Sequence, residues 1–542
     1  MSLFKGVFLS KKLIKSGVIV SVMTLVSRVL GLVRDIVIAN VMGAGVMADV
    51  FLFANKIPNF FRRLFAEGAF AQAFVPVLSE YHTRDELGEG KGEAIKLDQT
   101  RQLIAQTSGT LGVIITLVTL FGMLASPLFV MLFGGGWFID WFKNGPESVG
   151  GEKFTLAATL LKITFPYLWF ISFTALAGAV LNTMGRFAVS AFTPVLLNIA
   201  IIIMAIFGAD YTQSPAHALA WGVFLGGVIQ FFFQIPFLYK AKVLVKPRWS
   251  WHSDGVIKIR KLIVPALFGV SVTQINLLLD TLIASFLITG SISWLYYADR
   301  LLEFPLGLFG IGIATVVLPS LSKLHSKNNP QEFSATLDWG IKVISLFGWP
   351  ALAGLMVLAQ PIIMVLFMRG EFSEADVLQV SMALFAYLSG LLSFMFIKVL
   401  APGYYARQDT KTPVKIGIKA MVANMVFNVM LAPLFGYVGL AMATTLSATL
   451  NAWMLYRGLK ISGVYHLSSA TKLFIVKLMS AALIMAWVVY QLSAEFTVWL
   501  AMSVTEQIIQ LIFCISLGGL SYFIVVFLLG VRLNDFSVKS EK

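Results

Sequence analysis

Charged side chains crowd into one apolar stretch near the start of the chain, between Ser27 and Glu80. On insertion scales, one charge at membrane depth costs roughly 2.5–3.5 kcal/mol. A chain with several must keep most of them away from lipid, in a water-filled cavity or in ion pairs. The charged residues that could do chemistry here are Arg28, Arg34, Asp35, Asp49, Lys56, Arg62, Arg63 and Glu67.

Three of these charges recur at a fixed spacing. Asp49, Lys56 and Arg63 are seven residues apart, which is nearly two helical turns, so the spacing predicts that they share one helix face. Asn59 follows Lys56 by three residues and lies close to the same face. Pro58 falls within this stripe and is expected to kink or break the helix. The pattern indicates a polar helix face with bent backbone, which is tolerated beside a water-filled cavity.

A second, smaller polar group occurs in the other half of the chain, in the segment YYADRLLEFP. Glu303 follows Asp299 by four residues and Arg300 by three, so these side chains should form one helix face. Pro305 again predicts a kink.

The residue types favour an anion site. Guanidinium groups match phosphate oxygens with two parallel hydrogen bonds and stay charged at any working pH. The predicted anion-binding arginines are Arg28, Arg34, Arg62 and Arg300. Four carboxylates would pair with them when no anion is bound, or close gates: Asp35, Asp49, Asp299 and Glu303. The alternative is that these residues form internal ion pairs that only fix helix packing.

Six further polar residues are weaker candidates for this site: Lys56, Asn59, Arg63, Glu67, Asp280 and Lys398. Arg63 can also extend to the membrane interface while Arg62 faces inward. Asp280 could bind a cation, or be a hydrogen-bonded structural carboxylate.

Composition restricts the class of protein. The chain has 542 residues, of which 58% are hydrophobic and only 13% charged, and apolar runs of about 20 residues recur throughout, as in polytopic helical membrane proteins. A single cysteine, Cys514, excludes a disulfide within the chain. The five histidines lack metal-ligand spacing, and no phosphate-binding loop of the GxxxxGK[ST] type is present. The basic, apolar N-terminal segment lacks a clear cleavage site, which argues against a signal peptide.

The apolar runs predict an all-α fold with about 14 membrane spans. Their expected bounds are 17–42, 47–78, 103–134, 155–183, 188–208, 216–239, 262–288, 292–322, 338–367, 377–405, 412–433, 437–457, 472–492 and 503–530.

The net charge of +14 is explained by topology. Most lysines and arginines lie in the N-terminal segment and in every second connection, whereas the other connections hold only Lys143, Lys153 and Arg369. The positive-inside rule then places both termini in the cytoplasm. The basic side chains are also expected to attract anionic phospholipid headgroups. Nucleic-acid binding is not expected.

The chain also repeats itself weakly. Arg186 in NTMGRFAVSAFTP matches Arg407 in YARQDTKTP, and Leu219-Ala220 matches Leu440-Ala441 at the same separation. The repeat predicts two six-helix lobes in the same orientation, related by an axis along the membrane normal. The expected domains are an N-lobe (1–239), a cytoplasmic linker (240–261), a C-lobe (262–460) and two additional C-terminal helices with a tail (461–542).

Six segments of the chain closely resemble the MurJ (MviN) family of bacterial lipid II flippases, within the multidrug/oligosaccharidyl-lipid/polysaccharide exporter superfamily. The segments are SRVLGLVRD, GAGVMADVF, NKIPNFFRRLFAEGAFAQAFVPVLSEY, LLKITFPY, SWLYYADRLLEFP and KVLAPGYYARQDTKTPVKI. The resemblance covers nearly the whole chain and is weakest after about residue 460.

The resemblance implies a V-shaped, two-lobed transporter of the inner membrane. It would move undecaprenyl-pyrophosphate disaccharide-pentapeptide (lipid II) to the periplasmic leaflet by alternating access through a cationic cavity between the lobes. The family's cavity arginines correspond to Arg28, Arg34, Arg62 and Arg300, and Asp49 and Glu303 also fall in matching motifs. The expected partners are lipid II, membrane phospholipids and cell-wall synthesis proteins, and the expected state is a monomer. No cofactor is expected, and a coupling ion or the membrane potential would supply the energy for transport.

Three other functions stay open at this point. The same scaffold could export drugs or another lipid-linked glycan, although a basic cavity argues against cationic drugs. A membrane enzyme acting on polyprenyl-phosphate sugars is a second alternative, but the carboxylates in the connections form no recognisable catalytic group. A scaffold that only docks cell-wall enzymes is the third, and it predicts that the cavity arginines are dispensable.

Overall fold

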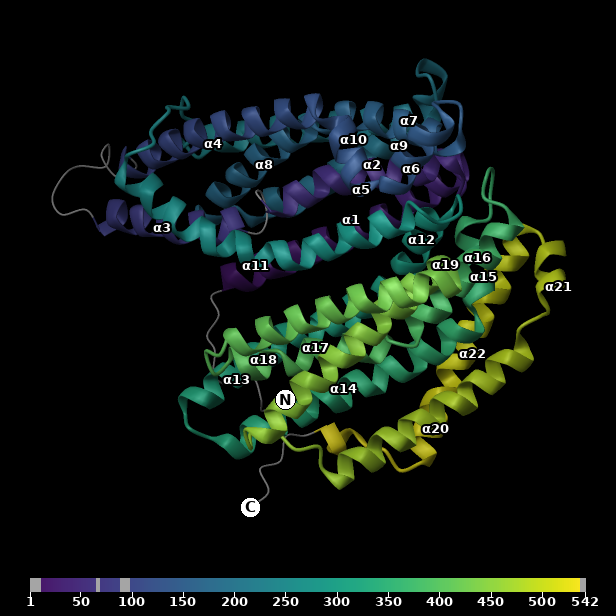
Figure 1. Ribbon diagram of the computed structural model, residues 1–542. Helices are drawn as coiled ribbons and strands as arrows, with labels where there is room; N and C mark the ends of the chain where they lie inside the picture. Colours follow the sequence, from purple (N-terminus) through teal and green to yellow (C-terminus); the bar gives the residue numbers. More distant parts are fainter. Residues whose placement is uncertain (1–10, 65–68, 88–97, 537–542) are drawn as a thin grey trace. The chain divides into compact units, whose positions relative to one another are not determined.

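The computed structural model describes residues 11–64, 69–87 and 98–536, and these residues form helices without a strand. The helices pack into two compact units, Met1–Phe286 and Leu287–Lys542. Figure 1 colours the chain by sequence, so that unit 1 runs from purple to teal and unit 2 from teal to yellow. The predicted all-α membrane fold is confirmed.

Unit 1 consists of eleven α-helices and one 3₁₀ turn in its described residues. Helix α1 packs along α9, α9 packs along α10, and α2 packs along α7. Helix α11 lies against α3. The bounds are α1 (Lys11–Met42), α2 (Val46–Arg62), α3 (Ala69–Leu87), α4 (Asp98–Leu124), α5 (Ser126–Phe133), α6 (Gly135–Asn144), α7 (Val149–Thr164), α8 (Pro166–Thr183), α9 (Phe187–Phe207), η3 (Ala209–Tyr211), α10 (Pro215–Lys240) and α11 (Asp254–Ala284).

Unit 2 also consists of packed helices in its described residues. Its C-terminal helices α20 and α22 pack with α14 around an apolar cluster that includes Leu478, Trp499 and Tyr522. The bounds are α12 (Ser291–Pro305), a π-helical segment η4 (Leu306–Gly310), α13 (Ile311–Ser326), α14 (Pro330–Val357), α15 (Ala359–Phe367), α16 (Glu374–Leu388), α17 (Leu391–Leu400), α18 (Pro402–Tyr405), α19 (Lys411–Ile461), α20 (Ser469–Leu492), α21 (Phe496–Ala501), α22 (Val504–Leu528) and η5 (Leu533–Phe536).

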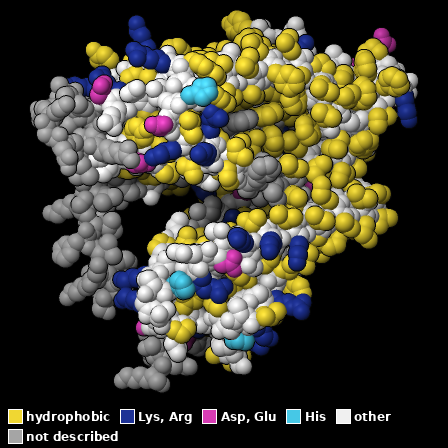
Figure 2. Space-filling view, turned by 60° about the vertical axis from the view of Figure 1, so that its left-hand side comes forward, with side chains coloured by type: hydrophobic (Ala, Val, Ile, Leu, Met, Phe, Trp, Pro, Cys, Tyr) yellow, Lys and Arg dark blue, Asp and Glu magenta, His cyan; other side chains and the backbone are white. Residues whose placement is uncertain are grey.

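Within the described ranges, ten helical stretches are long and apolar enough to cross a membrane. One of them, α19, contains two predicted spans, because its backbone leaves helical geometry at Gly436 (φ 58°). The predicted spans outside this set are 17–42, 47–78 and 262–288, which hold most of the charges considered above or are only partly described. On the face shown in Figure 2, hydrophobic side chains form broad continuous areas while lysines and arginines gather in small groups. The chain is a multi-pass membrane protein, and the count of 14 spans stays a prediction.

Prolines act differently at two of the predicted kinks. Helix α12 ends at Pro305 and continues into the π-helical segment η4, because proline removes one backbone donor and clashes with the preceding turn. Pro58 instead lies inside α2, which runs on to Arg62 and is followed by π-helical residues at 63–64. The change to π-helical geometry therefore follows Pro305 directly, whereas it comes about one helical turn after Pro58.

The connection between α10 and α11 forms an extended strap against α4. Its Arg248 N–H donates to the Ala105 carbonyl at 2.8 Å, and the Thr110 hydroxyl donates to the Ser250 carbonyl at 3.0 Å. Gly109 allows this approach, because a Cβ there would lie 2.2 Å from the carbonyl carbon of Arg248. The last part of the predicted linker 240–261 forms the start of α11.

Candidate functional site

The first polar centre ties α1 to α9. The Arg34 guanidinium contacts the Asp35 carboxylate at 2.7 Å, and Asp35 is almost fully buried, with 1% of its side chain exposed. A second Arg34 nitrogen donates to the Asn198 amide oxygen on α9 at 3.1 Å. The Asn198 amide nitrogen in turn donates to the Ser27 carbonyl at 3.1 Å. One arginine thus neutralises a buried carboxylate and helps to fix α1 against its neighbour.

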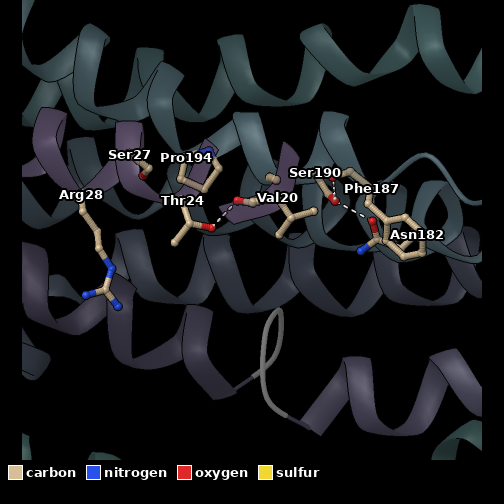
Figure 3. A pocket seen from close by; sticks show the side chains of 9 residues that line it. Val20, Thr24, Ser27, Arg28, Asn182, Phe187, Ser190 and Pro194 are labelled. Carbon is tan, nitrogen blue, oxygen red and sulfur yellow. Dashed lines mark hydrogen bonds between the residues drawn. The ribbon is translucent and has the colours of Figure 1, made fainter. Parts of the chain in front are cut away.

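Arg28 has a different environment, although it lies only two turns earlier on α1. Its side chain is exposed and forms no hydrogen bond or ion pair with any residue in the described ranges. It lies at one end of a pocket of about 420 Å³ formed by α1, α9 and the end of α8. Figure 3 shows the side chain extending away from its helix. Arg28 is therefore a predicted anion-binding arginine whose charge meets no carboxylate among the residues that the structure describes.

The second polar centre joins α2 to α7. The Lys153 ammonium lies 3.4 Å from the Asp49 carboxylate, and their side chains are only 4% and 2% exposed. The same ammonium lies 5.4 Å from the centroid of the Trp137 ring, within cation–π range. The sequence suggested that Lys153 lies in a connection. In the structure it lies in the first turns of α7, where Asp49 compensates its burial.

The start of α7 is fixed by a carboxylate on α6. Asp140 accepts hydrogen bonds from the Asn144 side chain at 2.6 Å and from the Gly150 N–H at 2.7 Å. These hydrogen bonds hold the pKa of Asp140 below its ordinary value, the Asn144 side chain being the larger cause. Asp140 thus anchors the helix turn that carries Lys153.

The rest of α2 presents polar side chains to α11. The Lys56 ammonium donates to the Thr281 hydroxyl at 3.1 Å, and Arg63 donates to the Gln274 amide oxygen at 3.3 Å. The predicted common face of Asp49, Lys56 and Arg63 therefore meets two neighbours, α7 at its start and α11 further along.

Arg62 has a hydrogen-bond partner within its own helix. Its Nε donates to the Asn59 side-chain oxygen at 3.0 Å, and the Asn59 amide donates to the Asn55 carbonyl at 2.8 Å. This chain of neutral groups holds the guanidinium at a defined position near the end of α2.

The predicted polar group of unit 2 forms on α12. Arg300 contacts Glu303 at 2.8 Å, and its guanidinium lies 5.4 Å from the Tyr296 ring centroid. The side chains of Arg300 and Glu303 are 34% and 50% exposed, so the pair is accessible to water or ligand. Asp299 is exposed on the same helix.

The weaker candidates are scattered. The Asn276 amide nitrogen lies 3.5 Å from an Asp280 oxygen, one turn earlier on α11. Lys398 is exposed on α17. Glu67 lies outside the described residues. The described residues contain no group of three or more His, Cys, Asp or Glu side chains that could hold a metal ion.

Sequence patterns did not predict the partners of these charges. Lys153, Asn198, Thr281 and Gln274 all lie far away in sequence, on other helices. Asn198 and Gln274 carried a usable signal, because a polar side chain within an apolar span usually has a structural or functional role.

The fold of the chain is similar to that of solved membrane transporters. The chain matches a structure described as an inward-facing multidrug resistance MATE family transporter of the MOP superfamily, with a TM-score of 0.64 over 82% of this chain and 98% of that one. At 15% identity this likeness shows the fold alone. The chain therefore shares its helical membrane fold with this transporter.

The family follows from closer relatives. The family model "Lipid II flippase MurJ" matches residues 38–510. The chain is 59% identical to the "Probable lipid II flippase MurJ" of Vibrio cholerae, over 99% of both chains, and 56% identical to that of Haemophilus influenzae, over 96% of this chain and all of the other. It is 28% identical, with a TM-score of 0.75, to a structure described as "Lipid II flippase MurJ, inward closed conformation", covering 94% of this chain and 98% of that one. The chain belongs to the lipid II flippase MurJ family and is a transporter rather than an enzyme.

Proposed function

We propose that this chain is a lipid II flippase, which moves the polyprenyl-pyrophosphate-linked disaccharide-pentapeptide from the cytoplasmic to the periplasmic leaflet of the inner membrane. Similarity to flippases along nearly the whole chain supports this function. The structural observation that carries it is the set of basic side chains on α1 and α2, in which the exposed Arg28 meets no counter-charge among the described residues.

The chemistry of the substrate fits these side chains. A pyrophosphate with large polar sugars cannot cross hydrocarbon unaided, because its polar groups would lose their hydration. Arginines offer charge-assisted hydrogen bonds to the phosphate oxygens in place of water. Arg34 and Arg62 are held by Asp35 and Asn59 at defined positions, whereas Arg28 has no partner among the described residues and can reach the anion.

The proposed orientation follows from charge. Both termini are cytoplasmic in this proposal, because lysines and arginines are concentrated in the N-terminal segment and in every second connection. The protein acts as a monomer in the inner membrane. Its transport cycle is alternating access. It also contacts cell-wall synthesis proteins in this proposal.

Arginine substitutions test this function. In cells depleted of the native protein, Arg28→Ala, Arg62→Ala and Arg300→Ala should each reduce labelling of the lipid-linked precursor by a probe confined to the periplasm. We expect a reduction of about tenfold or more, since one hydrogen bond to a charged group contributes about 1.5–3 kcal/mol. Arg34→Ala would leave Asp35 buried without its arginine, so it is tested together with Arg34→Ala/Asp35→Ala.

The control is Arg457→Ala, which removes an arginine stacked on Trp453 at the end of α19. It should keep normal labelling. Expression of every variant is measured in the same membranes. Normal labelling in all of the well-expressed variants would show that these arginines are structural and that the anion-site mechanism is wrong.

A further inference from the structure

The pocket beside Arg28 is lined by further polar side chains besides that arginine. Its lining comes from the first half of α1, the end of α8 and the start of α9, all within unit 1. Figure 3 shows Arg28 at one end of the row of lining residues, with Asn182 and Phe187 at the other. The lining residues are Val20, Thr24, Ser27, Arg28, Asn182, Phe187, Ser190, Ala191 and Pro194.

The end opposite Arg28 offers neutral hydrogen-bonding groups. The Ser190 hydroxyl donates to the Asn182 side-chain oxygen at 2.6 Å, which fixes the orientation of the Asn182 amide. The Asn182 Nδ2 donates no hydrogen bond to any residue in the described part of the chain. Pro194 has no N–H, so the carbonyl of Ser190 lacks its usual helical donor. This end of the pocket therefore offers an amide donor, beside a backbone carbonyl that lacks its helical donor.

The wall that carries these groups is held from behind. The Gln230 amide on α10 donates to the Thr193 carbonyl at 3.0 Å, and the Gln234 amide donates to the Thr193 hydroxyl at 2.9 Å. Both glutamines are almost fully buried, at 2% and 1% exposure. The contact between Asn198 and the Ser27 carbonyl holds α9 against α1. Because the two helices are tied together, the pocket is preformed.

The volume and the lining restrict the ligand. About 420 Å³ lies within the range of roughly 300–1,000 Å³ that is usual for small-molecule sites, and it is too small for a disaccharide with its peptide. A cation at one end, neutral donors and acceptors at the other, and a half-exposed aromatic ring beside them suit a phosphorylated sugar. A hydrocarbon chain would gain nothing from Arg28 or from the Asn182 amide.

We propose that this pocket binds the sugar joined directly to the pyrophosphate, with Asn182 and Ser190 contacting the sugar and Arg28 contacting the phosphate. The inference rests on the proposed flippase function. The turn between α8 and α9 and the first half of α1 lie on the side assigned to the cytoplasm by charge. The pocket is therefore where the headgroup is first bound, before it meets Arg34 and Arg62.

The test compares two synthetic ligands on the purified full-length protein. One is farnesyl pyrophosphate, and the other is the same lipid pyrophosphate carrying a single N-acetylated hexosamine. The wild-type protein should bind the sugar-bearing lipid more tightly. Asn182→Leu should reduce this preference by about tenfold and Ser190→Ala by a smaller factor, since one or two neutral hydrogen bonds are lost. Neither variant should change the affinity for farnesyl pyrophosphate, whereas Arg28→Ala should weaken the binding of both ligands.

Ser521→Ala is the matched control, because the Ser521 hydroxyl donates to the Gly518 carbonyl within α22 and Ser521 does not line the pocket. It should leave both affinities unchanged, and thermal unfolding confirms that each variant is folded. If the wild type shows no sugar preference, or if both pocket variants keep it, the sugar assignment is wrong while the flippase function stands. If the wild type binds neither lipid, the proposed function itself fails.

Discussion

Asp49 and Lys153 show how a buried charge is used in this protein. The two side chains are removed almost completely from solvent and lie 3.4 Å apart. Removing one partner of such a pair typically costs about 3–5 kcal/mol, because the other charge is left uncompensated, whereas replacing both can be nearly neutral. Asp49 therefore has a structural role on α2, where it pairs with a lysine rather than with one of the predicted arginines, and its gating role stays a prediction.

We predict that Asp49→Leu and Lys153→Met each lower the apparent unfolding temperature of the purified protein, corresponding to a loss of about 3 kcal/mol. The double variant should recover most of that loss. If the single and double variants are equally destabilised, the pair is not the source of the effect.

Transport by the double variant separates the two roles of Asp49. If it recovers stability and precursor labelling together, Asp49 acts only in packing. If it recovers stability but not labelling, the carboxylate is also required in transport.

At the scale of elements, the strap between α10 and α11 depends on one glycine. Gly109 lies inside α4, where alanine would ordinarily be more stable because glycine loses more conformational entropy on folding. A Cβ at this position, however, would meet the Arg248 backbone, with atoms at 2.2–2.6 Å. The strap cannot stay in place unless this residue lacks a side chain.

We predict that Gly109→Ala destabilises the protein by about 1–3 kcal/mol, as expected for overpacking. It should also speed limited cleavage by trypsin after Arg248, because the strap is displaced from α4. Thermal unfolding and the cleavage rate are the measurements. Gly519→Ala on α22, where no heavy atom lies within 4 Å of the added Cβ, is the control and should be neutral or stabilising. Unchanged cleavage in Gly109→Ala would contradict the role of the strap.

At the scale of the whole molecule, one pair of helix bounds agrees with the predicted repeat. Arg186 and Arg407 are separated by 221 residues. When 221 is added to the residue numbers of α10, the helix falls on 436–461. The second half of α19 runs from the break at Gly436 to Ile461. Span six and span twelve therefore correspond closely, which supports the prediction that the two sets of helices are related. Helix α11, with which the sequence predicts that the C-lobe begins at 262, lies in unit 1.

The source of energy is also a property of the whole molecule, and we propose that it is the membrane potential. Moving one elementary charge through 100 mV changes the free energy by about 2.3 kcal/mol, and the chain has several arginines that would move with the substrate. Dissipating the potential while keeping the pH gradient should trap the precursor inside, as measured by the same periplasmic probe. Dissipating only the pH gradient should have little effect, and the reverse result would point to a proton as the coupling ion.

The sequence by itself determined the membrane class, most of the helices and the unusual charge of α1 and α2, because hydropathy and charge are local properties of each segment. The Arg300–Glu303 pair was likewise predictable, since both residues lie on one helix at a spacing that brings them together.

Only the tertiary structure decided which charges are neutralised and which are left for a ligand. Asp49 meets Lys153 across 104 residues, and Arg34 meets Asn198 across 164. Seven-residue spacing drifts by about 20° per heptad on a straight helix, and a long helix crosses several neighbours, so residues of one predicted face can meet different partners. The pocket at Arg28 exists because α1, α8 and α9 pack together. A contact between distant helices depends on their packing, which no local pattern of residues specifies.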